Sequence, residues 1–195
     1  ELELAEMPEA TRSALGGDID EMGRMIDEYL DFARGDAGES PEPVDLDALL
    51  ADIVSDYERS KRNVRYDDHE TITLMIRPQA IRRALTNLID NALRYGGNTA
   101  VLALEQSATF VRIKITDAGK GIAEVEHENV FKPFTRIEPS RNNETGGVGL
   151  GLSIARAIAQ HHGGDVTLEN QRDATGAIQG LEVTLRLPKA VQPSA

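Results

Sequence analysis

The spacing of apolar residues between positions 44 and 188 switches repeatedly between a helical and a strand period, and this switching limits the fold most strongly. Steps of three and four residues predict helices over residues 45–57, 78–95 and 150–162. Alternation and short apolar runs predict strands at residues 71–76, 100–105, 110–116, 166–168 and 181–187. We therefore predict an α+β two-layer sandwich, with helices on one face of a mixed, mostly antiparallel sheet.

The N-terminal residues have a different pattern. Apolar residues from 10 to 34 recur at helical steps and follow Pro8, which predicts one amphipathic helix after the turn of a helical hairpin. Its apolar stripe needs a partner, either its own domain or a four-helix-bundle dimer, and we favour the dimer. A Gly-, Ser- and Pro-rich stretch then marks a linker. The predicted organisation is a partial hairpin at 1–36, a linker at 37–43, one domain at 44–188 and a tail at 189–195.

Composition excludes several classes of protein. The chain has no Cys, so a disulfide framework or a thiolate metal site is impossible. It has 21 Lys and Arg against 33 Asp and Glu, a net charge of -12, which argues against nucleic acid as a general partner. No apolar run approaches the roughly 18 to 20 residues of a membrane span. Because the chain begins without Met in helical sequence, we expect a fragment whose missing N-terminal segments hold any membrane anchor.

The predicted helix at 78–95 carries two carboxamides on one face. Asn87 and Asn91 are four residues apart, and Arg94 follows one turn later. Amide oxygens suit a hard divalent ion, and a guanidinium suits phosphate. Taken alone, such a stripe is more often a solvated helix face, although Asn is disfavoured inside helices.

Two glycine-bearing motifs follow later in the chain. Asp117-Ala118-Gly119-Lys120-Gly121 comes directly after a predicted strand. A carboxylate there can accept a hydrogen bond from an exocyclic amine such as that of adenine, and glycines allow close approach to a flat base. Gly147-Val148-Gly149-Leu150-Gly151-Leu152 runs into a helix, whose N-terminal N–H groups favour an anion. Each motif alone is more often a turn or a packing feature.

A long polar segment separates these two motifs. Phe131-Lys132-Pro133-Phe134-Thr135-Arg136 lies within residues 124–145, where few other apolar residues occur. Long loops with an apolar anchor are often catalytic lids. Because it can bury little apolar surface, we expect this lid to be mobile without nucleotide and ordered with it.

Taken in order, the four motifs resemble those of a known family. N-L-I-D-N-A-L-R-Y, D-A-G-K-G-I, F-K-P-F-T-R and G-V-G-L-G-L look like the N, G1, F and G2 boxes of sensor histidine kinases. The resemblance covers nearly all of residues 44–188, and the overall pattern is similar to the EnvZ-like branch of the family. The run D-E-Y-L-D-F-A-R-G further resembles the end of the second dimerisation helix. It implies the Bergerat ATP-binding fold and a kinase that transfers the γ-phosphoryl of Mg-ATP to a histidine.

The resemblance also implies roles for single residues. In the N box, Asn91 matches the Mg²⁺ ligand and Asn87 its catalytic neighbour, while Arg94 and Tyr95 match positions that approach the phosphates and cover the nucleotide. Asp117 matches the adenine-reading carboxylate, in a pocket shaped by Gly119, Gly121 and Ile122. The lid hinge and phosphate-facing turn match Gly147, Gly149, Leu150, Gly151 and Leu152. Two lid arginines, Arg136 and Arg141, compete for the γ-phosphate.

The sequence departs from this family at the phosphoryl acceptor. The family places it in an H-[ED]-x-x-[TN]-P motif, which surrounds none of His69, His127, His161 and His162. His161 and His162 end a predicted helix, where its dipole favours them. The resemblance implies that the acceptor lies before residue 1, that the N-terminal helices form a homodimer, and that a response-regulator receiver domain is the partner. It further implies the cytoplasmic portion of a bacterial inner-membrane protein.

Three other functions share parts of this pattern. An ATP-hydrolysing clamp of the chaperone, gyrase or mismatch-repair type uses a Glu base where this chain has Asn87. A serine-phosphorylating anti-sigma kinase lacks a preceding dimerisation hairpin. A non-catalytic interaction module remains open because the chain contains no acceptor.

Overall fold

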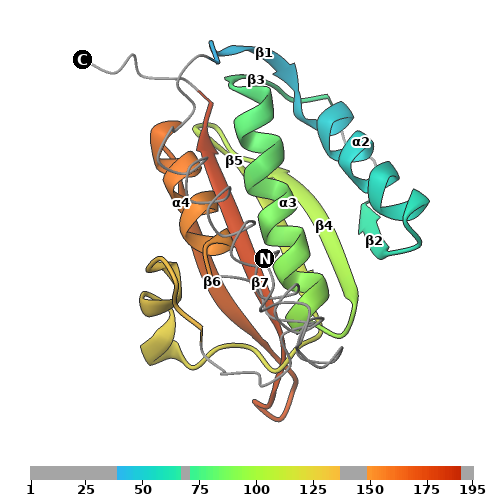
Figure 1. Cartoon of the computed structure of the whole chain (residues 1–195), viewed down its shortest axis with the longest axis vertical. Helices are drawn as coiled ribbons and strands as arrows, with labels where there is room; N and C mark the ends of the chain where they lie inside the picture. Colours follow the sequence, from blue (N-terminus) through green and yellow to red (C-terminus); the bar gives the residue numbers. More distant parts are fainter. Residues whose placement is uncertain (1–38, 67–70, 137–148, 190–195) are drawn as a thin grey trace, which may run out of the picture. The chain divides into compact units, whose positions relative to one another are not determined.

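The computed structural model of the chain describes residues 39–66, 71–136 and 149–189 (Figure 1). The chain divides into two units between Ala37 and Gly38, and all described residues belong to the second. The expected helix at 10–34 therefore lies outside the described residues, and so do His69, Arg141 and Gly147.

A five-stranded sheet forms one layer of the domain, in the order β2-β4-β5-β7-β6. Its strands are β2 (Asn63–Tyr66), β4 (Thr99–Gln106), β5 (Phe110–Asp117), β6 (Asp165–Arg172) and β7 (Ile178–Pro188). Strand β2 pairs in parallel with β4, and the other neighbouring strands are antiparallel. Two further strands, β1 (Glu42–Asp45) and β3 (Thr73–Ile76), form a separate antiparallel ribbon.

Three helices cover one face of this sheet (Figure 1). They are α2 (Leu46–Arg59), α3 (Pro78–Tyr95) and α4 (Gly151–His161). Asp45 caps α2 by accepting the N–H groups of Asp47 and Ala48, and Pro78 occupies the first turn of α3, where no N–H is needed. The α+β sandwich with a mixed sheet is confirmed.

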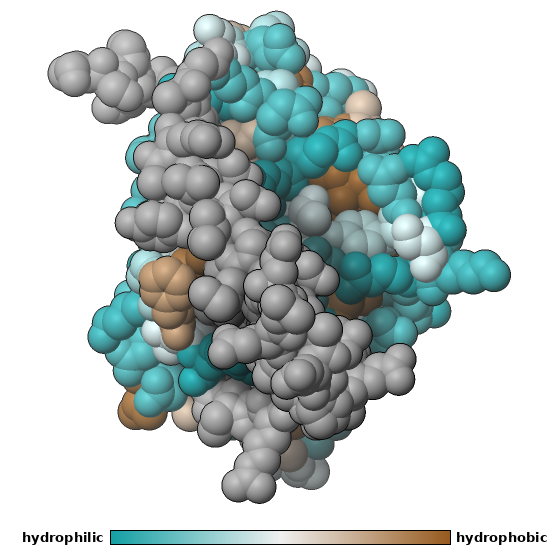
Figure 2. Space-filling view, viewed as in Figure 1, coloured by the Kyte–Doolittle hydropathy of each residue, from teal (hydrophilic) through white to brown (hydrophobic). Residues whose placement is uncertain are grey.

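The core lies between the two layers. On β5, Val111, Ile113 and Ile115 point toward the helices and are fully buried, while Arg112 and Lys114 point away. The buried stripe of α3, including Leu85 and Leu88, packs on them. On the face shown in Figure 2, the described surface is mainly hydrophilic, and hydrophobic areas are small and separate.

Two strands and several element ends differ from the sequence prediction. Strand β1 falls partly in the expected linker, and β2 was not expected at all. Each is short and carries no run of apolar residues, and each is paired with a strand distant in the sequence. Strand β6 continues to Arg172 through polar residues, because β7 supplies its hydrogen bonds. The domain boundaries themselves stay predictions.

A residue before β1 caps the start of α3. The Glu39 carboxylate accepts the N–H groups of Gln79 and Ala80, at 2.7 and 3.1 Å, and its carbonyl accepts from Arg77 Nε at 2.9 Å. A negative charge at a helix N-terminus offsets the positive end of the helix dipole. Glu39, within the expected linker, is therefore fixed to the domain.

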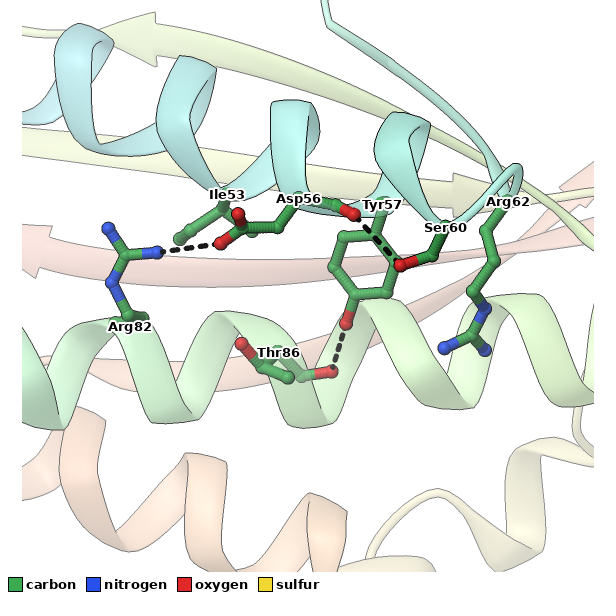
Figure 3. A pocket seen from close by; sticks show the side chains of 7 residues that line it. All are labelled: Ile53, Asp56, Tyr57, Ser60, Arg62, Arg82 and Thr86. Carbon is green, nitrogen blue, oxygen red and sulfur yellow. Dashed lines mark hydrogen bonds and ion pairs between the residues drawn. The ribbon is translucent and has the colours of Figure 1, made fainter.

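A hollow of about 220 Å³ lies between α2 and α3. Its lining residues, shown in Figure 3, are Ile53, Asp56, Tyr57, Ser60, Arg62, Arg82 and Thr86. Tyr57 Oη donates to Asp90 Oδ1 at 3.1 Å, and Arg62 Nη1 lies 2.7 Å from the same oxygen. Burial and the Asp90 carboxylate raise the pKa of Tyr57, which keeps it a phenol donor. Arg82 pairs with Asp52 and Asp56. These paired charges connect α2 to α3 across the hollow.

His162 joins the end of α4 to the start of α3. It is only 7% exposed. Its Nε2 lies 3.1 Å from the backbone N of Arg77, and its Nδ1 lies 2.8 Å from the carbonyl oxygen of Ile158. A backbone N–H can only donate, so Nε2 accepts and Nδ1 carries the proton. His162 is thus a neutral ring held by two hydrogen bonds. The expected placement of both histidines by the helix dipole therefore applies only to the exposed His161.

We expect His162→Ala to lower the free energy of unfolding by roughly 1–3 kcal/mol, because it leaves the Arg77 N–H without its acceptor. Urea denaturation of the purified chain measures this. The matched control is His161→Ala, at the exposed neighbouring position, which should change the free energy by less than about 0.5 kcal/mol. Equal effects of the two substitutions would show that the His162 ring does not stabilise the contact between α4 and α3.

Candidate functional site

Asp117 is a buried carboxylate at the end of β5. It is 9% exposed, and its Oδ1 accepts the N–H groups of Gly119 at 2.7 Å and Leu181 at 3.3 Å. Burial raises the pKa of the Asp117 carboxyl, and these two hydrogen bonds oppose that rise. Within the described ranges, Oδ2 has no hydrogen-bond partner. Asp117 therefore offers one acceptor oxygen to a ligand while the other oxygen holds the fold.

Three glycines allow separate backbone segments to meet at Asp117. A Cβ on Gly96, just after α3, would lie 2.1 Å from Asp117 Cβ, and one on Gly180 of β7 would lie 2.0 Å from the Asp117 carbonyl oxygen. A Cβ on Gly119 would lie 2.5 Å from the Tyr95 carbonyl oxygen. Sequence analysis found Gly119 but missed Gly96 and Gly180. Gly180 lies inside β7, where a glycine often marks a close backbone approach, and Gly96 directly follows α3.

The two N-box asparagines of α3 face the start of α4. A Cβ on Gly151 would lie 3.3 Å from Asn91 Nδ2 and 3.7 Å from Asn87 Cβ, so glycine keeps this contact close. Asn87 Nδ2 is buried and has no hydrogen-bond partner in the part of the chain that the structure describes. A buried donor left unpaired costs about 1–3 kcal/mol. This amide therefore points to a ligand that brings an acceptor.

The N-terminus of α4 lies at the same place. Its N-cap residue, Leu150, makes no side-chain cap hydrogen bond. The N–H groups of the first turn thus keep the positive end of the helix dipole available to an anion. The side chain of Leu150 is 1% exposed and belongs to the core, and Leu152 packs partly against the core. Leu150 can therefore meet a ligand only through its backbone.

The loop after Asp117 is held by a residue that sequence analysis missed. Asn170 on β6 accepts the Ile122 N–H at 2.9 Å and donates to the Ile122 carbonyl at 2.7 Å. Gly121 precedes this contact with a φ of 67°, a conformation that favours glycine. Asn170 lies outside all four motifs, so no local pattern could have indicated its role.

The F box is attached to α4 and to the G2 box. The guanidinium of Arg156 lies 4.3 Å from the centre of the Phe131 ring and also bonds Asp165 and Glu128. The Phe134 N–H donates to the Gly149 carbonyl at 3.0 Å. Gly149 has a φ of 80°, and a Cβ there would lie 2.7 Å from the Thr135 carbonyl oxygen. The described base of the expected lid is thus packed, with Val130 buried.

The structure gathers the described site residues around the C-terminal half of α3. Asn87 and Asn91 meet Gly151, and the end of the helix meets the Asp117 loop. Arg94 and Tyr95 are exposed at this end of α3, and Tyr95 is 57% exposed. Arg136 is exposed at the end of the described F box. Arg141 and Gly147 lie outside the described residues, and the mobility of the lid stays a prediction.

A buried acceptor at one end, with amides and a helix N-terminus beside it, defines a site of the nucleotide-binding class. The chain belongs to the family of histidine kinase-, DNA gyrase B-, and HSP90-like ATPases, whose profile matches residues 76–191. Within that family, it is the ATP-binding catalytic domain of a protein histidine kinase.

Similar proteins support this assignment. The chain is 37% identical over 182 residues to the sensor histidine kinase GtrS of Pseudomonas aeruginosa, covering 93% of this chain and 36% of that protein. The ATP-binding domain of PrrB from Mycobacterium tuberculosis is 31% identical with a TM-score of 0.61, covering 80% of this chain and 100% of that one. The histidine kinase domain of the Escherichia coli osmosensor EnvZ is 28% identical with a TM-score of 0.56, covering 80% and 93%.

We expect Asp117→Asn to weaken adenine nucleotides more than guanine nucleotides. If the amide oxygen keeps the Gly119 and Leu181 hydrogen bonds, the NH₂ group replaces Oδ2 and meets the exocyclic amine of adenine as a second donor. Calorimetric titration with ATP and GTP measures the difference. Equal losses for both nucleotides would mean that Asp117 only shapes the turn.

The same substitution should raise the stability of the nucleotide-free domain at neutral pH. The folded-state pKa of Asp117 is raised, so protonation favours the fold, and stability is lost as pH rises through that pKa. The amide removes this loss. The advantage of Asp117→Asn in urea denaturation should therefore shrink as pH is lowered and wild-type Asp117 becomes protonated. A constant advantage at every pH would contradict this explanation.

Proposed function

We propose that this domain transfers the γ-phosphoryl group of Mg-ATP to a histidine that lies outside the given sequence. The observation that carries the proposal is the unpaired, buried Asn87 Nδ2, which lies beside Asn91 and the N-terminus of α4. These groups suit phosphate oxygens, and the buried Asp117 suits the amine of adenine. Both ends of one ATP molecule would thus meet the last turns of α3.

The amide stripe also fits a divalent ion. The described residues contain no group of three or more His, Cys, Asp or Glu able to hold a metal. In this proposal a magnesium ion would be held by the Asn91 amide oxygen together with phosphate oxygens, since Mg²⁺ commonly binds through few protein ligands. When bound, Mg²⁺ neutralises negative charge on the β- and γ-phosphates.

Catalysis in this proposal rests on positioning. The bond from the γ-phosphorus to the bridging oxygen of ADP breaks, and a bond to an imidazole nitrogen of the acceptor forms. Asn87 would orient the phosphates and Tyr95 would cover the nucleotide. Arg94, with Arg136 or Arg141, would supply cations to the transferring group. Ordering of the segment from Glu124 to Thr145 by nucleotide belongs to the same proposal.

The rest of the pathway is also proposed. The chain spans 36% to 46% of the length of the first curated relatives that it matches. We propose that the whole protein is a homodimer through its N-terminal helices and relays the phosphoryl group to an aspartate of a response-regulator receiver domain. We further propose a cytoplasmic kinase part, attached to the membrane by preceding segments. Among the described residues, no helix is long and apolar enough to cross a membrane.

The alternatives fit the residues less well. A hydrolysing clamp needs a carboxylate base one turn before the metal ligand, and Asn87, whose amide cannot accept a proton, occupies that position. A serine-phosphorylating kinase would not need the amphipathic helix predicted at 10–34. These alternatives and the interaction module give different outcomes in the transfer assay below.

We expect Asn91→Ala to weaken Mg-dependent ATP binding at least tenfold while the domain stays folded, because the substitution removes a metal ligand and leaves the buried core residues of α3 unchanged. Calorimetric titration with and without Mg²⁺ measures the loss, and circular dichroism reports the fold. The matched control is Gln79→Ala, an exposed amide on the same helix, which should bind as wild type does. Unchanged affinity in Asn91→Ala would remove this residue from the site.

We expect the chain to label a separately purified dimerisation hairpin that bears the family's histidine motif, when both are incubated with γ-labelled Mg-ATP. The label on the hairpin should be labile to acid and stable to base, as a phosphorus–nitrogen bond is. Three other outcomes would contradict transfer to histidine. Phosphate release without the hairpin would indicate a hydrolysing clamp, acid-stable label would indicate a serine kinase, and absence of ATP binding would indicate an interaction module.

A further inference from the structure

The side chain of Asn170 pairs with both backbone polar groups of Ile122, in the loop after Asp117. Asn170 Oδ1 lies 2.9 Å from the Ile122 nitrogen, and Asn170 Nδ2 lies 2.7 Å from the Ile122 carbonyl oxygen. One carboxamide thus satisfies both the donor and the acceptor of one residue, as a neighbouring strand would. Because the side chain is short and anchored on β6, this pair fixes both the position and the orientation of the Ile122 backbone.

One further contact stabilises this part of the loop internally, and another ties it to the same edge of the sheet. His127 Nε2 lies 3.0 Å from the Ile122 carbonyl oxygen, and Arg172 of β6 pairs with Glu124 at 3.1 Å. A Cβ on Gly121 would lie 2.2 Å from Asn170 Oδ1, so the loop leaves no room for a side chain there. The loop is therefore packed tightly against the Asn170 carboxamide.

The loop is consequently fixed at two points with the base-binding residues between them. At its start, Asp117 Oδ1 accepts the Gly119 N–H at 2.7 Å. At its end, Asn170 holds Ile122, which packs partly against the core. Gly119, Lys120 and Gly121 bridge these two points. A shift of Ile122 would move Gly121 and Gly119, and with them the hydrogen bond that orients the Asp117 carboxylate.

We propose that Asn170 is a positioning residue for the purine base of the bound nucleotide. It acts through the backbone of Ile122 and holds the loop in the conformation that presents Asp117 Oδ2 and a flat glycine surface to the base. This inference rests on the proposed binding of ATP and adds a residue to the base-recognising half of that site. It sets how well the base binds and leaves phosphate binding at Asn87, Asn91 and α4 unchanged.

The decisive substitution is Asn170→Asp, which keeps the size and the acceptor of the side chain but removes its NH₂ donor. It also places a carboxylate oxygen against the Ile122 carbonyl oxygen. The matched control is Asn63→Asp on β2, an exposed amide at the opposite edge of the same sheet that donates to Thr99 Oγ1 at 3.0 Å. Titration calorimetry compares wild type and both variants with Mg-ATP, adenosine and inorganic tripolyphosphate.

Asn170→Asp should bind ATP and adenosine at least tenfold more weakly than wild type, while tripolyphosphate binds all three proteins equally. Asn63→Asp should resemble wild type with every ligand. Lowering the pH toward about 5 should narrow the difference between Asn170→Asp and wild type, because a protonated carboxyl regains a donor toward the Ile122 carbonyl. If Asn170→Asp does not fold, Asn170→Ser, which keeps a hydroxyl, should show a smaller loss for adenosine and none for tripolyphosphate.

The results separate this inference from the proposed function. Wild type that binds ATP, with Asn170→Asp within twofold of it for adenosine, overturns the role of Asn170 and leaves ATP binding intact. Equal losses for adenosine and tripolyphosphate also overturn it, since they indicate a general structural effect. Failure of wild type to bind ATP overturns both proposals, and wild type that binds ATP but not adenosine overturns the role of Asn170 alone.

Discussion

Among the described residues, the buried Asp117 side chain sets where the backbone segments of the site meet. Asp117 continues the inward alternation of Val111, Ile113 and Ile115, so the same period that builds the core places a charge at its edge. Two backbone N–H groups from different segments hold one of its oxygens. A buried charge is costly unless it is hydrogen-bonded. The loop after β5, at Gly119, and strand β7, at Leu181, therefore both approach the Asp117 carboxylate. The glycines at that point make this convergence sterically possible.

Helix α3 connects the core to the rest of the site. One stripe of the helix is fully buried, and the face with Asn87 and Asn91 meets the start of α4. Its C-terminal end meets the Asp117 loop. The distance between phosphate-binding and base-binding groups is therefore set by a rigid, buried helix, which is how a fold keeps ligand-binding groups in fixed positions.

Sequence alone predicted the parts of this structure that have a long period or a local motif. The alternation of β5 and the stripe of α3 predicted the layers, and the D-A-G-K-G and G-V-G-L-G-L runs indicated many residues of the candidate site. Strands β1 and β2 were missed because neither contains a run of apolar residues and their pairing partners are distant in the sequence. Asn170 and Gly180 were missed for a related reason. Each acts through a contact with a loop more than forty positions away in the chain, and nothing in the neighbouring sequence reports that contact.

The Glu39 cap ties the segment before β1 to the helix that carries the site amides. Its carboxylate accepts two N–H groups of the first turn of α3, and its carbonyl accepts from Arg77 Nε. A force applied at Glu39 would therefore load the hydrogen bonds at the start of α3 directly. The opposite half of the same helix carries Asn91. One continuous helix thus links the residue that would take up such a load to an amide of the site.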